Sequence, residues 1–521
     1  MSAPHSPVGA LGPPGRAAAP GRTLIVSNRL PVTARIVGGE VRLQQSNGGL
    51  ATGLRSVHEH QGGLWIGWSG LTDGASVSVH HVLASRLRDV GALSVPLLEE
   101  EVAGYYRGYS NSALWPVLHD CLRQPLVGCR DWELYRAVNE RYADVVAQHL
   151  RAGDRVWIHD FHLMLLPRLV RDRCPGARIG FFLHTPFPPA ESFATLGEAP
   201  ELLDGVLGAD LIGFHTGDYG RHFTSAVRLM LGQPATSDET EADGLLPGVF
   251  TCPMGIDVPF FAAWARRPAV IAQAARIRGA CEGPLFVGID RLDYTKGLVE
   301  RLLAFERLLE LEPNLRGRAR LIQVAVPSRE NVSGYAENRR AVEALVAHLN
   351  HRYGNDEWTP VEYRYRSVDT ATLVALYRAA DVMLVTPVCD GMNLVAKEFV
   401  ACRDDGDGVL VLSSRAGAAA ELHAAVLTDP NDLDDLVRAY RAALEMSAVE
   451  RRVRMRHLRL TVETHDVFQW AKRYLEALGG TVGHAAGNKT GLTGRAAAGL
   501  RLLHKSDGHR SVPGWRRGRA G

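Results

Sequence analysis

The sequence lacks several features that would place it in a familiar class of protein. No apolar run approaches the roughly 18 residues that a membrane-spanning helix needs. Seven cysteines are scattered without a CxxC pair, which disfavours a zinc ribbon or redox motif and is typical of a reducing cytosol. With 59 basic and 57 acidic residues, the net charge of +2 gives no bulk reason to expect a nucleic-acid or membrane partner.

Short cofactor and metal motifs are also missing. The chain contains neither GxGxxG nor GxxxxGK[ST], which disfavours a dinucleotide-binding Rossmann site and a P-loop kinase. His159 and His162 in "HDFH" resemble a ligand pair, but there is no HExxH motif and no cysteine close by. We therefore expect no metal and no cofactor.

The two ends of the chain lack the periodic apolar pattern of a folded core. Residues 1–22 are rich in Pro, Gly and Ala and have no apolar segment of a secretory signal, so we expect a disordered leader on a cytoplasmic protein. Residues 479–521 carry many Lys and Arg, with Asp507 as the one acid, and we expect a basic disordered tail. An interaction arm for nucleic acid is the less favoured alternative.

Between these ends, short apolar runs alternate with longer segments of helical period. Strands are expected at 23–28, 155–159, 178–183, 209–214, 284–289, 319–326, 382–386, 408–413 and 424–428. Helices are expected at 162–173, 217–231, 297–311, 333–351, 369–379, 394–402, 430–446 and 466–477. Uninterrupted apolar strands between helices predict parallel sheets that are covered on both faces.

This alternation occurs twice, before and after about residue 255, and a chain of 521 residues is too long for one ordinary core. The Pro- and Gly-containing stretch 251–261 fits a crossing between two units. The sequence therefore predicts two doubly wound α/β domains that face a cleft. Ligands of such sheets bind at the carboxyl ends of the strands.

Charged and imidazole side chains follow most of the expected strands, at the ends where ligands bind. They are Arg29, Asp160, His184, Arg291, Lys296, Arg329 and Asp390. Arginine and lysine pair well with phosphoryl oxygens, so the four cations of this set predict a phosphorylated ligand. The glycine-rich turn 47–54 offers a weaker, backbone-based anion site.

Two aromatic stretches, 64–70 and 105–116, stand among Gly, Ser and Asn. Such residues suit loop ends that line a sugar site, because aromatic rings stack on C–H faces and carry polar groups. Packing in the core is the other interpretation.

The stretch "VCDGMNLVAKE" joins a strand to a helix through an acid, a glycine and an amide. Gly391 would allow close backbone approach, and Asn393 occupies the expected helix N-cap, so that backbone N–H groups could face an anion. Glu398 lies within an otherwise apolar helix, which suggests that it binds a ligand.

Taken together, these motifs resemble one family, the α,α-trehalose-phosphate synthases of glycosyltransferase family 20. The matching stretches, in order, are "SNRLPV", "GGLATGL", "WIGWSG", "YSNSALWP", "VWIHDFHLMLLP", "IGFFLHTPFP", "DLIGFHT", "RLDYTKGL", "PSRE" and "DGMNLVAKE". The resemblance implies a GT-B architecture of two Rossmann-like domains. The implied units are an acceptor-binding domain 23–255, a nucleotide-sugar-binding domain 256–465 and a returning helix 466–478.

The resemblance also implies a reaction. Glucose would pass from UDP-glucose or GDP-glucose to glucose 6-phosphate with retention of the α configuration, giving trehalose 6-phosphate without a metal or cofactor. Implied partners are these small molecules, with no membrane. A homo-oligomer, either dimer or tetramer, and the identity of the donor base stay open.

Site residues follow from the resemblance position by position. The implied acceptor ligands are Arg29, Tyr106, Trp115, Asp160 and Arg329. The implied donor ligands are Gly48, Gly49, His184, Arg291, Lys296, Val368, Asp390, Gly391, Met392, Asn393, Leu394, Val395, Ala396, Lys397 and Glu398. The residues expected to carry catalysis are Asp160, His184, Arg291, Lys296 and Asp390.

Two departures and two alternatives remain. Relatives commonly have an arginine where this chain has Cys389, and we expect little loss of function from the change. The base-facing loop is expected near 363–369, without a signal for one base. The alternatives are a pseudo-glycosyltransferase that couples cyclitols and a catalytically inactive regulatory homologue.

Overall fold

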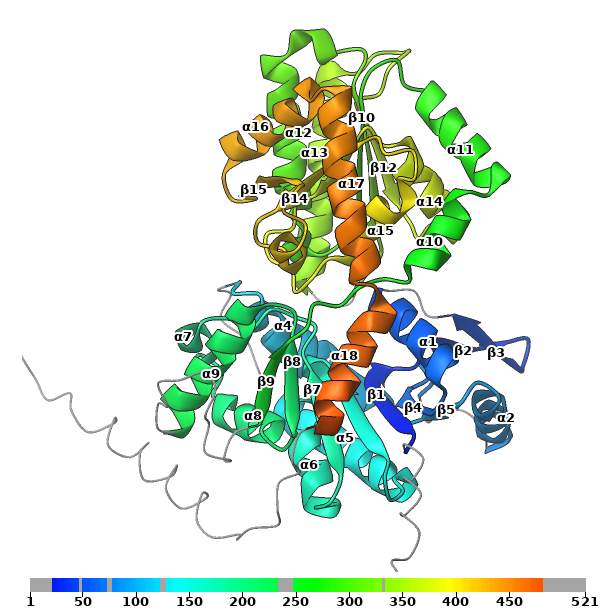
Figure 1. Cartoon of the computed structure of the whole chain (residues 1–521), viewed down its shortest axis with the longest axis vertical. Coiled ribbons are helices and arrows are strands. Elements are labelled where there is room, and N and C mark those ends of the chain that lie inside the picture. The colour runs from blue at the N-terminus through cyan, green and yellow to red at the C-terminus, as the bar shows by residue number, and fades with distance from the viewer. Residues whose placement is uncertain are drawn as a thin grey trace, which may run out of the picture.

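The computed structural model describes residues 21–45, 49–72, 77–121, 128–232, 247–329 and 333–480. Two lobes, each built around a parallel sheet, are stacked along the long axis of the molecule (Figure 1). The sequence-based expectation of two parallel-sheet α/β units is confirmed. Within the described ranges, every helix is too short or too polar to cross a lipid bilayer.

The N-terminal lobe contains the larger sheet. Its strands, in spatial order, are β5 (Ala92–Ser94), β4 (Leu64–Trp68), β1 (Thr23–Arg29), β6 (Arg155–His159), β7 (Arg178–Phe182), β8 (Leu211–Phe214) and β9 (Gly248–Thr251). All neighbouring strands in it are parallel. An antiparallel hairpin, β2 (Val32–Val37) and β3 (Glu40–Gln45), stands beside it.

Helices of this lobe cover both faces of the sheet. They are α1 (Gly49–Gln61), α2 (Val77–Arg88), α3 (Glu99–Glu101), the π-helix η1 (Val102–Leu114), α4 (Trp115–Leu118), α5 (Cys129–His149), η2 (Phe161–Leu163), α6 (Leu166–Arg173), α7 (Ala190–Phe193), α8 (Ala199–Val206) and α9 (Gly217–Leu231).

The C-terminal lobe has a second parallel sheet with the order β12 (Val361–Tyr365), β11 (Arg320–Val326), β10 (Leu285–Arg291), β13 (Val382–Val385), β14 (Val409–Ser413) and β15 (Val426–Thr428). Its helical segments are α10 (Val258–Ala265), α11 (Pro268–Gly279), η3 (Tyr294–Lys296), α12 (Leu298–Leu311), η4 (Pro313–Leu315), α13 (Ser333–Tyr353), α14 (Thr370–Ala379), α15 (Leu394–Cys402), η5 (Gly417–Ala420), α16 (Leu433–Glu445) and α17 (Ala448–Thr464).

Each central strand contributes to two hydrophobic cores. In β1, Leu24 and Val26 pack into one core and Ile25 into the core on the opposite face. In β10, Val287 and Phe286 divide in the same way. Alternate side chains of a strand point to opposite faces, so a strand that is covered on both faces must be apolar throughout. This is the physical reason for the uninterrupted apolar runs in the sequence.

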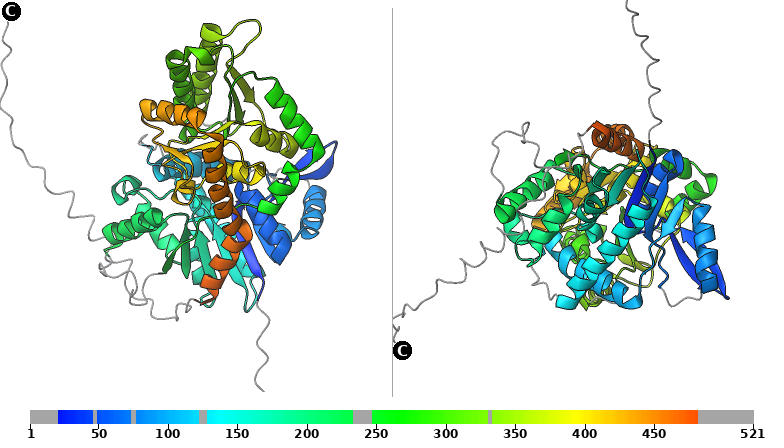
Figure 2. Two further views of the ribbon diagram at one scale, coloured as in Figure 1. Left: turned by 45° about the horizontal axis from the view of Figure 1, so that its top comes forward. Right: turned by 90° about the horizontal axis from the view of Figure 1, so that it is seen from below.

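The chain crosses between the lobes twice. It leaves β9 at Thr251 and enters α10 at Val258, and it returns where α17 ends and α18 (Val467–Gly480) begins (Figures 1 and 2). The two crossings touch, because the Val467 N–H donates to the Ile256 carbonyl at 3.0 Å. Helix α18 then packs on the N-terminal sheet, where the Tyr474 hydroxyl is 2.9 Å from the carbonyl oxygens of Phe181 and Leu211.

Local structure differs from three expectations. The prediction that the aromatic stretches 64–70 and 105–116 are loop ends is wrong. The first stretch forms β4 and the second forms most of η1. Trp65, Tyr105 and Tyr109 are core residues. The expected base-facing loop 363–369 begins inside β12. The expected helix 162–173 is divided into η2 and α6.

Candidate active site

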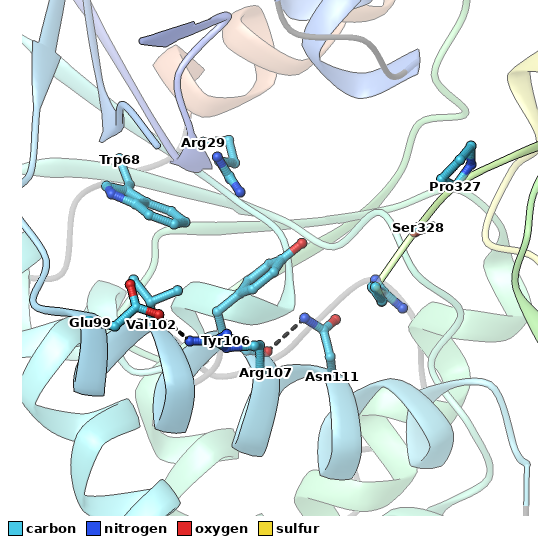
Figure 3. Close-up of a pocket in the computed structure, with 10 residues that line it drawn as sticks. Arg29, Trp68, Glu99, Val102, Tyr106, Arg107, Asn111, Pro327 and Ser328 are labelled. Atoms are coloured by element: carbon cyan, nitrogen blue, oxygen red, sulfur yellow. Dashed lines mark hydrogen bonds and ion pairs between the residues drawn. The ribbon is translucent and has the colours of Figure 1, made fainter. Parts of the chain in front are cut away.

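A cavity of about 340 Å³ opens between the two lobes. The lining residues from the N-terminal lobe are Arg29, Trp68, Glu99, Val102, Tyr106, Arg107 and Asn111, and those from the C-terminal lobe are Pro327, Ser328 and Arg329. Figure 3 shows the Tyr106 ring rising from η1 toward the middle of the cavity. The carboxyl ends of β1 and β11 therefore meet at one site, as the rule for parallel sheets requires.

Guanidinium groups lie over aromatic rings on this side of the site. The Arg29 Cζ is 4.1 Å from the Trp68 ring centroid, and the Arg329 Cζ is 3.9 Å from that of Trp115. Arg291 approaches the same Trp115 ring at 5.6 Å. A guanidinium that stacks on a ring keeps N–H donors at its edge, so these arginines can still bind a phosphate.

Tyr106 is electrostatically coupled to the same cations. Burial raises the pKa of the Tyr106 phenol, but the positive charges of Arg329, Arg29 and Arg291 outweigh burial, and the net shift is downward. Three guanidinium groups thus act on one hydroxyl. Such a concentration of positive charge favours a dianionic ligand at this position.

Asp293 fixes both Arg329 and the turn that carries Lys296. Its carboxylate accepts hydrogen bonds from the Thr295 N–H at 3.0 Å and the Tyr335 hydroxyl at 3.0 Å, and it pairs with Arg329 at 3.4 Å. Burial raises the pKa of this carboxyl, but Arg329, Arg291 and Lys296 lower it to about 2. Asp293 is therefore ionised and neutralises part of the surrounding positive charge.

Asp160 lies where β6 turns into η2, in a conformation that is uncommon for a residue with a side chain. Its φ is +75°, and its carboxylate accepts the His184 N–H at 3.3 Å. Burial raises the pKa of Asp160 to about 6, against the opposing effects of the hydrogen bonds and of Arg329 and Arg291. Backbone strain of about 1–3 kcal/mol at such a residue is usually found at functional sites.

On the other side of the cleft, Lys296 and Asp390 form a half-buried ion pair at 2.5 Å. The Asn393 amide also donates to Asp390, at 3.0 Å. Burial raises the pKa of Asp390, but the charge and the hydrogen bond of Lys296, together with the Arg291 charge, outweigh burial, and the net shift is downward. Asp390 is thus an ionised acceptor that is held in place from two directions.

Asn393 occupies the N-cap position of α15, as predicted, but its side chain does not cap the helix. The residue has φ of +75° and its amide is directed to Asp390 instead. The N–H groups in the first turn of α15 therefore have no side-chain cap. A helix N-terminus of this kind is a ready anion site.

Gly391 brings the two lobes into close contact. A Cβ at this position would lie 2.0 Å from the His184 carbonyl oxygen, so no side chain fits. The close contact seen here is with the His184 main chain, and the expected approach of the Gly391 backbone to an anion stays a prediction. The Tyr219 hydroxyl from the N-terminal lobe also donates to the Asp390 carbonyl at 3.2 Å. These contacts place His184 beside the Asp390 loop.

Glu398 and Lys397 on α15 have different surroundings. The Glu398 carboxyl accepts the Tyr377 hydroxyl at 2.7 Å, and burial raises its pKa to about 7. The Lys397 ammonium is buried, donates to the Met254 carbonyl at 2.8 Å and pairs with Glu421 at 2.5 Å. The structure therefore engages Lys397 at the contact between the lobes and does not direct its charge to the cleft.

Other predicted site residues are placed as follows. Met392 and Ala396 are buried, whereas Val368, Leu394 and Val395 are half-buried beside the C-terminal core. Gly49 begins α1, and Gly48 lies outside the described residues. Among the described residues, no group of three or more His, Cys, Asp or Glu side chains could hold a metal ion.

Sequence reasoning missed several residues of the site. Trp68 lies within the quoted "WIGWSG" motif, so the aromatic stretch was a usable signal. Asn111 lies in "YSNSALWP" and donates to the Tyr106 carbonyl at 2.6 Å. Tyr335 receives the Arg329 N–H at 2.5 Å, and nothing in the local sequence marks it, because it lies in an ordinary helix.

Two parallel-sheet lobes with a cation-lined cleft between them have the arrangement expected of the GT-B architecture. The family model described as Glycosyltransferase family 20 matches residues 21–479. A trehalose-6-phosphate synthase of Mycobacterium avium (strain 104) is 41% identical over 468 residues, covering 87% of this chain and 94% of the relative. The chain therefore belongs to glycosyltransferase family 20.

Two further comparisons agree. A bifunctional trehalose-6-phosphate synthase/phosphatase of Thermoproteus tenax is 42% identical over 469 residues. The match covers 88% of this chain and 63% of that longer protein. The crystal structure of a UDP-forming α,α-trehalose-phosphate synthase from Burkholderia xenovorans in complex with glucose-6-phosphate has a TM-score of 0.78 and 32% identity, covering 88% of this chain and 100% of that one.

Proposed function

We propose that this protein transfers glucose from a nucleotide-glucose to glucose 6-phosphate, giving α,α-trehalose 6-phosphate and a nucleoside diphosphate with retention of configuration. The proposal is supported by the relative from Burkholderia, which is described as UDP-forming and as a complex with glucose-6-phosphate. UDP-glucose is accordingly the first donor to test, followed by GDP-glucose.

The observation that carries this proposal is the pair of aromatic-stacked arginines across the cavity. Arg29 comes from the N-terminal lobe and Arg329 from the C-terminal lobe, and both act on the Tyr106 phenol. A sugar phosphate with its phosphate beside Tyr106 would be bound by both guanidinium groups. Its ring would then extend toward Asp160, whose ionised carboxylate can accept hydroxyl hydrogen bonds.

The donor would lie on the other side of His184. Arg291, Lys296 and the uncapped N-terminus of α15 would bind the diphosphate, because all three present positive charge or N–H donors. Asp390, held by Lys296 and Asn393, would accept hydrogen bonds from glucose hydroxyls. Glu398 would face the ribose, with its carboxyl oriented by Tyr377.

We propose a same-face substitution. A double-displacement mechanism requires a carboxylate free to attack the anomeric carbon. Asp390 is engaged by Lys296 and Asn393, an arrangement that suits hydroxyl binding better than attack. The diphosphate would depart toward the cations while the acceptor hydroxyl attacks from the same face and gives its proton to a phosphate oxygen. Catalysis then rests on positioning and on stabilisation of the leaving group.

We further propose the division into an acceptor-binding domain 23–255, a nucleotide-sugar-binding domain 256–465 and a returning helix 466–478. The positions of Arg29, Tyr106 and Asp160 in the first unit and of Lys296, Asp390 and Glu398 in the second support this division.

The test is release of nucleoside diphosphate from UDP-, GDP- and ADP-glucose, with and without glucose 6-phosphate. We expect release with one or two donors that depends on glucose 6-phosphate, and trehalose 6-phosphate as the product. Absence of release with every donor would overturn the proposal. A cyclitol-coupled product without a glycosidic bond would replace it with the pseudo-glycosyltransferase alternative.

A further inference from the structure

Three histidines lie in a row at the carboxyl ends of adjacent strands in the N-terminal sheet. His159 ends β6, His184 follows β7 and His215 follows β8. The ring centroids of His159 and His184 are 5.3 Å apart, as are those of His184 and His215. The proposed function uses only the middle histidine, so the roles of its two neighbours are unexplained.

All three rings are neutral near neutral pH. Burial is the largest effect on each, and it lowers the pKa of His159 and His184 well below the usual value and that of His215 to about 3. A neutral imidazole has one N–H donor and one lone pair. The direction of each hydrogen bond in the row therefore fixes a tautomer.

The contact between His159 and His184 joins the His159 Nδ1 and the His184 Nε2 at 3.0 Å. One of these nitrogens must donate and the other must accept. If His184 donated, His159 would carry its own proton on Nε2. That nitrogen is buried and has no hydrogen-bond partner among the described residues, and the neighbouring rings are Trp157 and Trp470.

Orphaned buried N–H groups are rare in proteins, and buried acceptors without a donor are somewhat less rare. Of the two possible arrangements, the more favourable one is therefore that in which the His159 Nε2 has an unpaired lone pair and not an unpaired N–H. In this arrangement the His159 Nδ1–H donates to the His184 Nε2. His184 must then carry its proton on Nδ1, which is the ring nitrogen left for a ligand.

We propose that His159 is a positioning residue that holds His184 as the Nδ1–H tautomer, so that an N–H donor and not a lone pair faces the reacting groups. This inference rests on the proposed function for the identity of those groups. An N–H can donate to a glucose hydroxyl or to an oxygen of the departing diphosphate. A lone pair at the same place would repel the negative charge that develops on the leaving group.

His215 holds the main chain of the same residue. Its Nδ1 accepts the Met254 N–H at 3.3 Å, so its proton is on Nε2, and the ring is hydrogen-bonded to the His184 backbone. The His184 backbone also abuts Gly391, because a Cβ there would lie 2.0 Å from the His184 carbonyl oxygen. The ring and the main chain of His184 are thus fixed by separate neighbours.

Two amide variants of His159 distinguish its effect on the His184 tautomer from its effect on packing. In His159→Asn, the amide nitrogen can take the place of the imidazole Nδ1, so the donor to His184 is retained. In His159→Gln, the amide group lies near the position of Nε2, and that donor is lost. Both variants place one polar amide in the same buried site, so each serves as the control for the stability of the other.

For activity we expect kcat to fall at least about tenfold in His159→Gln, on the scale of one hydrogen bond, and to stay within about threefold of the wild type in His159→Asn. The KM for glucose 6-phosphate should be unchanged in both. Equal loss in the two variants, or normal kcat in His159→Gln, would overturn the inference.

A second readout does not depend on turnover. In the whole protein labelled with ¹⁵N-histidine, the His184 resonances, assigned with a His184→Gln sample, should show a protonated Nδ1 and an unprotonated Nε2. The opposite assignment in the wild type would overturn the inference even if the variants failed to fold. An inactive wild type with the expected tautomer would instead refute the proposed function alone.

Discussion

The two sides of the cleft hold their cations in different ways. On the proposed acceptor side, Arg29 and Arg329 lie over the rings of Trp68 and Trp115. On the proposed donor side, Arg291 only approaches the Trp115 ring, at 5.6 Å, and Lys296 is held by the carboxylate of Asp390 at 2.5 Å. The first arrangement orients the cation by its flat face, to which Arg329 adds contacts with Asp293 and Tyr335, and the second orients it by a salt bridge without an aromatic ring.

This difference has a chemical consequence. A stacked guanidinium is positioned while its edge remains open to two phosphate oxygens, which suits a phosphate that is bound and released unchanged. A lysine paired with an aspartate positions two groups at once, which in the proposed function are a cation for the leaving diphosphate and an acceptor for sugar hydroxyls. We therefore expect loss of a donor-side cation to reduce turnover, and loss of an acceptor-side cation to weaken binding.

The largest effect should come from the donor side. We expect Lys296→Ala and Arg291→Ala each to lower kcat by at least about 100-fold, the scale of one preorganised contact to developing charge. Steady-state assays at saturating donor and acceptor would measure this. Near-normal kcat in both variants would contradict the proposed stabilisation of the leaving group.

On the acceptor side, we expect Arg29→Ala to raise the KM for glucose 6-phosphate by about 10- to 100-fold, because hydrogen bonds to charged groups contribute about 1.5–3 kcal/mol. The matched control is Arg29→Lys, which keeps the charge but loses the planar stacking. Its KM for glucose 6-phosphate should lie between the values of the wild type and of Arg29→Ala. With unphosphorylated glucose as the acceptor, the wild type and Arg29→Ala should react at similar rates. If Arg29→Ala were also much slower than the wild type with unphosphorylated glucose, Arg29 would not act through the phosphate.

Asp160 should give a smaller effect that depends on pH. Its pKa is raised to about 6, so the carboxylate that we propose to accept sugar hydroxyls is present above this pH and is lost as the pH falls below it. We expect kcat/KM for the acceptor to decline below about pH 6 in the wild type. In Asp160→Asn, kcat/KM for the acceptor should be about tenfold lower than in the wild type at pH 8. The part of the decline below about pH 6 that comes from protonation of Asp160 should be absent in this variant.

The second ionisation of the acceptor phosphate falls near the same pH, at about 6. It affects the wild type and Asp160→Asn equally, so the difference between their profiles isolates Asp160. Unchanged saturation kinetics for the acceptor in Asp160→Asn would contradict its role.

The smallest effect is expected at Cys389, beside the donor-side pair. Burial raises the pKa of its thiol to about 12, and its backbone N–H donates to the Thr295 carbonyl at 3.3 Å. The residue is therefore held by its backbone, and its thiol is protonated. We expect Cys389→Ser to change kcat by less than about twofold in the same assay. A larger loss would show that the side chain at this position supports the Lys296–Asp390 pair.

Much of the fold could be predicted where burial imposes one pattern. The helix 394–402 and the strand 155–159 have the bounds that their periodicity indicates, because one element faces a core along one stripe and the other faces cores on both sides. The π-helix η1 was missed, because its Gly, Ser and Asn residues are typical of loops. Its tertiary packing against α5 and η2 outweighs local propensity.

The candidate site shows the same division. Strand-end charges such as Arg29 and Lys296 could be picked out, because the carboxyl ends of parallel strands meet at one edge. Lys397 shows where this reasoning stops. It stands beside Glu398 in the sequence, yet neighbouring residues on a helix point in different directions, and its ammonium meets Met254 and Glu421.

By itself, the sequence determined the two parallel sheets, nine of the thirteen strands described in them and the residue types at the ends of those nine. These properties follow from periodicity and from local chain chemistry. Only the tertiary structure decided which side chains meet, as Arg329 and Trp115 do across the lobes and as His159 and His184 do within the N-terminal lobe. Such pairings depend on distances of a few ångströms between segments far apart in the chain, and no local pattern encodes them.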